Sequence, residues 1–171
     1  MFNKNDNSIS IIQYNTSISK NHYKELFFHE YGHYRTSLYL QDNHITNNIL
    51  TWFNKGISEY IRYGNSTNAS FKLEKTMDFQ KLDKEKSFEE SDKAPFNIYL
   101  QSYLAVNKMI NMKGNQIIRD ILDETKKTDY DSAFRLKMGI SYKINYLKNL
   151  LFSVQKVEFE VFLPCDHNHF L

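Results

Sequence analysis

Cysteine and glycine are scarce in this sequence, and their scarcity excludes several classes of protein. The chain has one cysteine, Cys165, in 171 residues. A single thiol excludes an internal disulfide framework and a cysteine-rich zinc finger, because each needs several cysteines. The five glycines form no glycine-rich phosphate loop, and the sequence contains no G-x-S-x-G nucleophile elbow. The sequence therefore lacks the motifs of phosphate-loop proteins and of hydrolases built on such an elbow.

Long apolar runs and a strong net charge are also missing. No apolar run approaches the roughly 18 residues that a membrane-spanning helix needs. Residues 1–7 carry charges with no apolar stretch after them, so no signal peptide is visible. We expect the chain as written to be cytoplasmic, or secreted if it is a piece of an exported relative. A net charge of +2 with scattered lysines argues against a nucleic-acid partner.

Apolar and aromatic residues, in contrast, are plentiful. They make up 41% and 15% of the chain, which is enough for a packed core and argues against global disorder. A chain of this length suits one domain that buries about two-thirds of its unfolded surface. We therefore expect a single domain over residues 1–171.

The hydrophobic pattern predicts a mainly helical fold with at most one strand near each end of the chain. Ser19 is the expected N-cap of the first helix, Pro95 is expected to open the third, and Gly114 to end it. Residues 72–93 are dense in charges of both signs, so we expect an exposed helix or a mobile excursion there. The expected helices are residues 22–40, 50–61, 95–111, 117–122, 131–137 and 142–154; the expected strands are residues 8–14 and 157–162, the second within a terminal strand and tail at 156–171.

The first helix carries the most informative motif of the chain. Residues 29–33 read HEYGH, an H-E-x-x-H sequence. Histidines four residues apart on a helix are offset by only about 40° and about 6 Å of rise. His29 and His33 can therefore reach one tetrahedral ion, and Glu30 can take a proton from a water bound to it. An alternative is that both histidines are core residues hydrogen-bonded to the backbone.

The residues around this motif resemble a known group of enzymes. Residues 28–34 read FHEYGHY and residues 50–60 read LTWFNKGISEY. They resemble the thermolysin-like gluzincin clan of zinc metallopeptidases, and most closely peptidase MA-like families and bacterial collagenases. The pattern of those families is H-E-Y-x-H-Y, followed by T-W-x-x-E-G-x-A-E-[YF]. Residues 99–106, with Gly114 and residues 131–134, are similar to the helical C-terminal part of such domains, so the resemblance extends over roughly residues 20–140.

The resemblance implies a fold, a metal and a partner. The expected fold is zincin-like and mainly α, an α+β remnant in which a second helix completes the zinc site beside the H-E-x-x-H helix. The expected cofactor is Zn²⁺, and the expected partner is a peptide or protein substrate. Relatives place a sheet before the first helix and bind substrate along its edge strand. Only about twenty residues precede that helix here, so we expect an N-terminally short relative, a fragment, or a domain that pairs with another chain.

One residue departs from the resembled pattern. The glutamate that serves as the third zinc ligand in the E-G step is replaced by Lys55. An ammonium has no lone pair for zinc, and neutralising a lysine at pH 7 costs roughly 4–5 kcal/mol before any bond forms. Glu59, one turn later, has three possible roles. It binds zinc directly, it orients a histidine through the other ring nitrogen, or it is a surface carboxylate paired with Lys55.

The resemblance also implies roles for catalytic residues. With zinc bound, Glu30 would act as the general base on the metal-bound water. Tyr99 is the candidate that would stabilise the oxyanion. Three hypotheses follow: a zinc metallopeptidase, a catalytically impaired relative that acts as a binding or structural module because of Lys55, and a helical domain with a chance motif.

Overall fold

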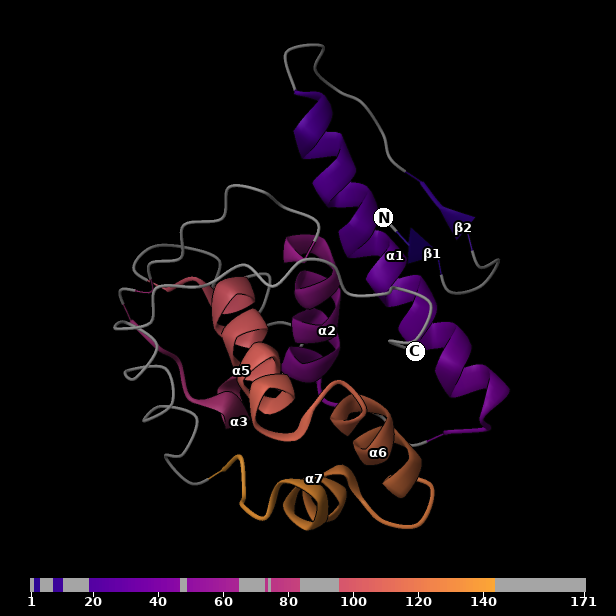
Figure 1. The fold of residues 1–171 in the computed structure, drawn as a ribbon, viewed down its shortest axis with the longest axis vertical. Coiled ribbons are helices and arrows are strands. Elements are labelled where there is room, and N and C mark those ends of the chain that lie inside the picture. Colours follow the sequence, from indigo (N-terminus) through magenta and orange to yellow (C-terminus); the bar gives the residue numbers. More distant parts are fainter. Residues whose placement is uncertain are drawn as a thin grey trace.

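The computed structural model describes residues 2–3, 8–10, 19–46, 49–64, 73, 75–83 and 96–143. Within these ranges the fold is mainly helical, as predicted (Figure 1). The strands β1 (Phe2–Asn3) and β2 (Ser8–Ile9) form a short antiparallel pair beside α1. The helices are α1 (Lys20–Asp42), α2 (Thr51–Tyr63), α3 (Phe79–Leu82), α5 (Ile98–Lys113), α6 (Ile117–Glu124) and α7 (Tyr130–Met138).

Helix α2 packs against both α1 and α5 (Figure 1). Two glycines allow these helices to approach closely. A Cβ atom added to Gly32 of α1 would lie 2.6 Å from the Ser58 Cα of α2, and one added to Gly56 of α2 would lie 2.5 Å from the Ser102 carbonyl oxygen of α5. Both distances are shorter than a van der Waals contact, so the close approach needs a residue without a side chain at each crossing.

The centre of the core is aromatic. Trp52 and Phe53 at the start of α2 are fully buried, and the Trp52 ring contacts Phe79, Phe134 and Tyr142. Because these rings come from separate segments, they join α2, α3 and α7 in one hydrophobic core.

The boundaries of the helices test the sequence predictions in detail. Ser19 caps α1 and accepts a hydrogen bond from the His22 amide, as predicted. Gly114 ends α5 with a φ of 83°, a conformation that favours glycine. The predicted start of that helix at Pro95 was wrong: α5 begins at Ile98, and the Asn97 side chain caps it by accepting from the Leu100 amide. An amide oxygen satisfies a free helical N–H, which proline at the first position cannot do.

Two other segments differ from the prediction, and several predicted elements lie outside the described residues. Residues 72–93 were expected to form an exposed helix or a mobile excursion, but in the described part of this range Phe79 and Leu82 of α3 are buried in the core. Tyr142 and Lys143 lie in a turn rather than in a helix. Residues 144–154 of the helix predicted at 142–154, most of the strand at 8–14, and the terminal strand and tail at 156–171 lie outside the described residues. None of the described helices is long and apolar enough to cross a membrane.

Candidate metal centre

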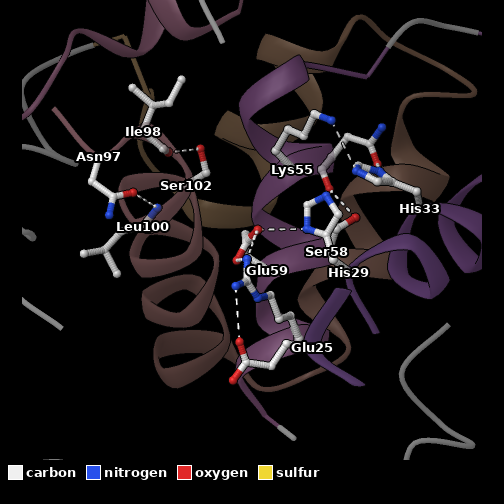
Figure 2. A network of polar contacts seen from close by, with 12 residues as sticks. Glu25, His29, His33, Lys55, Ser58, Glu59, Asn97, Ile98, Leu100 and Ser102 are labelled. Carbon is white, nitrogen blue, oxygen red and sulfur yellow. Dashed lines mark hydrogen bonds and ion pairs between the residues drawn. The ribbon is translucent and has the colours of Figure 1, made fainter. Parts of the chain in front are cut away.

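The crossing of α1 and α2 brings His29 and His33 against Lys55 and Glu59 (Figure 2). Helix α1 supplies His29, Glu30 and His33, and α2 supplies Lys55 and Glu59. The two imidazole rings lie edge to face with their centroids 4.8 Å apart. The i, i+4 spacing therefore places both histidines at one point, as the helical geometry predicts.

Tyr99, at the start of α5, lies near both His29 and Lys55. Its ring centroid is 6.2 Å from that of His29 and 6.0 Å from Lys55 Nζ. The structure thus places the predicted oxyanion-stabilising residue beside the histidine pair.

Glu59 contacts the Nδ1 nitrogen of His29. His29 Nδ1 is 2.8 Å from Glu59 Oε1, although the ring is turned so that its N–H does not point straight at the oxygen. Glu59 is 1% exposed, so the carboxylate is inside the protein. This contact uses Nδ1 and leaves the Nε2 of His29 as the nitrogen that faces away from Glu59. Of the three roles considered for Glu59, the geometry matches the one in which it orients a histidine.

The buried Glu59 carboxylate is neutralised by Arg62. Arg62 Nη1 lies 3.4 Å from both carboxylate oxygens of Glu59, and Arg62 Nη2 lies 3.3 Å from Glu25 Oε2. Burial acts to lower the pKa of Arg62, but Glu59, Tyr63 and Glu25 raise it above its ordinary value. The contacts Glu25–Arg62–Glu59–His29 form a series in which the buried Glu59 carboxylate has a partner on each side. A buried charge requires such partners.

Lys55 faces His33. Lys55 Nζ lies 3.4 Å from His33 Nε2 (Figure 2). The other ring nitrogen of His33, Nδ1, lies 3.4 Å from Asn54 Oδ1. Burial, the Lys55 charge and His29 together lower the pKa of His33 from 6.5 to about 3. His33 is therefore neutral at pH 7. The Asn54 oxygen selects the tautomer with the proton on Nδ1, so the lone pair of Nε2 points at the ammonium.

The residues present do not fit a catalytic zinc ion. Such a site takes three protein ligands and keeps a fourth position open for water. Among the described residues no group of three or more His, Cys, Asp and Glu side chains is placed to hold a metal. The ligand position of the resembled pattern carries Lys55, and Glu59 is occupied by His29 and Arg62. The site supplies two imidazoles that can donate to a metal and, in place of a third donor, the Lys55 ammonium.

Three residues of this site were missed by the sequence analysis. Glu25 lies one turn before His29 and Arg62 one turn after Glu59, so helical periodicity alone could have placed both near the site. Asn54 gave no signal, because its contact with His33 depends on how α1 and α2 cross.

The fold and the site define a metallopeptidase-like domain, with an H-E-x-x-H helix beside a second helix whose Glu59 contacts the first histidine of the motif. Comparison with known proteins agrees. The sequence model of the collagenase family, peptidase M9, matches residues 3–148, and the chain belongs to this family. Members of the family are in general zinc-dependent peptidases. Membership excludes the hypothesis of a chance motif in an unrelated helical domain.

One curated relative is YhcO of Bacillus subtilis (strain 168), described as an uncharacterized protein. It is 26% identical over 121 residues, which cover 66% of this chain and 36% of the relative. This chain therefore spans little more than a third of that protein. No solved structure matches the chain.

The lowered pKa of His33 predicts how stability depends on pH. Between about pH 6.5 and pH 3 the unfolded chain binds a proton at this residue that the folded chain does not. The contribution of His33 to stability is therefore complete above pH 6.5. As the pH falls below 6.5, the free energy of unfolding decreases by up to about 1.4 kcal/mol per pH unit. Urea denaturation at pH 7.5, 6 and 5 measures this slope.

A pair of histidine variants isolates the effect. We expect His33→Gln to flatten the dependence on pH, and His22→Gln, at an exposed position of the same helix, to leave it unchanged. Equal slopes in the wild type and His33→Gln would show that protonation of another group controls acid stability.

Proposed function

We propose that this chain is a catalytically impaired member of the collagenase family, which binds a peptide or protein segment without zinc-dependent hydrolysis. One observation carries the proposal: Lys55 Nζ lies 3.4 Å from His33 Nε2, the nitrogen that would bind a metal. Lys55 also stands at the residue position from which the family supplies its third ligand. The site retains both histidines, but the Lys55 ammonium lies on the side of His33 where a metal would bind.

Charge and geometry both support this proposal. Zinc bound to an imidazole lies about 2.0–2.1 Å from the nitrogen, so an ammonium directed at the same lone pair competes for the same space. The positive charge of Lys55 also repels a divalent cation. The carboxylate of Glu59 cannot offset that repulsion from where it lies, because its charge is already balanced by Arg62.

A second candidate is peptide hydrolysis with zinc, and the retained residues favour it. Glu30 is present as a general base, His29 keeps the carboxylate partner that orients it, and Tyr99 lies nearby. This function would require Lys55 to leave His33, and Glu59 to exchange its contacts with His29 and Arg62 for the metal.

An assay with gelatin and zinc distinguishes the two candidates. We expect the wild-type chain, supplemented with zinc, to cleave gelatin no faster than the Glu30→Gln variant, because no activated water is available for Glu30 to deprotonate. Loss of the general base lowers the rate of an active metallopeptidase by at least about 10²-fold. A wild-type rate that far above Glu30→Gln would establish the hydrolytic function instead.

A further inference from the structure

The Lys55 ammonium has no anionic partner among the described residues. Its contacts are with the Nε2 atom of His33, 3.4 Å away, and with the ring of Tyr99, 6.0 Å away. Neither group carries a negative charge. The side chain is partly buried, so water solvates the ammonium less fully than it would at an exposed position.

The carboxylate best placed in sequence to neutralise Lys55 is used elsewhere. Glu59 is four residues later on α2, the spacing of a helical ion pair. It contacts His29 at 2.8 Å and Arg62 at 3.4 Å instead. The structure therefore has the ion pair Glu59–Arg62 in place of the surface pair Lys55–Glu59 that the sequence offered as one alternative. Glu59 does not neutralise the charge of Lys55.

We infer that Lys55 is the binding group for a carboxylate, namely the C-terminal carboxylate of a peptide. An ammonium offers three N–H donors, of which the His33 nitrogen can accept only one. A carboxylate supplies the missing charge and acceptors, and a charge-assisted hydrogen bond of this kind is about twice as strong as a neutral one.

One carboxylate matches the charge of Lys55. The Glu59 carboxylate is already balanced by Arg62 and does not neutralise this ammonium. A monoanion such as a peptide C-terminus supplies the single negative charge that Lys55 lacks, whereas a phosphate dianion would leave a surplus.

A peptide terminus fits the surroundings better than a small free acid does. The half-buried ring of Tyr99, with its centroid 6.0 Å from Lys55 Nζ, is an apolar surface against which the side chain of a terminal residue can pack. This inference rests on the proposed function, since a bound zinc ion would occupy the same place as the carboxylate.

Binding of three probes to the ¹⁵N-labelled chain tests the inference. The probes are N-acetyl-trialanine with a free C-terminus, the same peptide as its C-terminal amide, and sodium acetate. Chemical shifts of the Gly56 and Ser58 amides, next to Lys55 on α2, report binding. We expect the free acid to bind at least about tenfold more tightly than the amide, from the loss of a charge-assisted hydrogen bond. Acetate is expected to bind more weakly than the acid peptide at the same amides.

Variants connect the binding to Lys55. We expect Lys55→Gln to abolish the preference for the free acid and Lys113→Gln, at an exposed position of α5, to preserve it. Equal affinity for acid and amide, no binding of either peptide, or a preference that survives Lys55→Gln would overturn the inference. Acetate bound as tightly as the acid peptide would assign the site to small free acids. Cleavage of the peptides would instead contradict the proposed function, so the two failures are distinguishable.

Discussion

Replacing Lys55 with glutamate is expected to convert the site into one that binds about one zinc ion per chain. The substitution removes the ammonium from His33 Nε2 and supplies a carboxylate from the residue position that the family uses for its third ligand. Glu59 need not move, because it continues to orient His29. Bound zinc at 100 times its Kd stabilises the folded chain by about 2.7 kcal/mol, which a zinc-dependent rise in Tm reports.

The design of this experiment separates ligand supply from loss of charge. Lys55→Gln removes the same positive charge without adding a carboxylate, so we expect much weaker zinc binding and little rise in Tm. Adding His29→Ala to Lys55→Glu should abolish the gain by removing one of the three ligands. If Lys55→Gln bound zinc as tightly as Lys55→Glu, the repulsion by Lys55 alone would have been the obstacle.

The Gly56→Ala variant is expected to be strongly destabilised. The added Cβ would lie 2.5 Å from the carbonyl oxygen of Ser102 and 2.6 Å from Val106 Cγ2. A backbone oxygen within α5 cannot move aside without moving that helix, so α2 and α5 must separate. Overpacking of this kind costs about 1–3 kcal/mol or more, and each kcal/mol lowers Tm by roughly 2–4 °C for a chain of this size. Thermal and urea denaturation both measure the loss.

Gly64→Ala is the matched control for that variant. Gly64 is exposed at the end of α2 with a φ of −59°, a conformation that alanine adopts readily. We expect it to change the free energy of unfolding by less than about 1 kcal/mol in either direction. A Gly56→Ala variant as stable as Gly64→Ala would show that the contact between α2 and α5 leaves room for a Cβ atom at position 56.

Much of the fold followed from local signals in the sequence. The helix that carries the H-E-x-x-H motif was predictable because its apolar residues recur at helical spacing and Ser19 caps its start. The burial of Phe79 and Leu82 was not, because the charged residues around them conceal two core positions in a four-residue helix. Periodicity needs several turns to be detected, and this helix has about one.

The sequence predicted which residues form the site but not which of their atoms contact one another. The spacing of His29 and His33 and the position of Lys55 follow from the sequence. Which carboxylate contacts which nitrogen follows from the crossing of α1 and α2, and this crossing selects among the three roles open to Glu59. Arg62 explains why Lys55 does not pair with Glu59. Its guanidinium contacts the Glu59 carboxylate, and Lys55 contacts His33 instead.

The zinc content of the wild-type chain tests the central claim most directly. The purified protein is incubated with excess zinc, passed through a desalting column and analysed for metal per chain. If the Lys55 ammonium holds the place of the metal, the wild type retains far less than one zinc ion, and His29→Ala retains no less than the wild type does. About one zinc per wild-type chain, lost in His29→Ala, would contradict the claim and establish a metal centre despite Lys55.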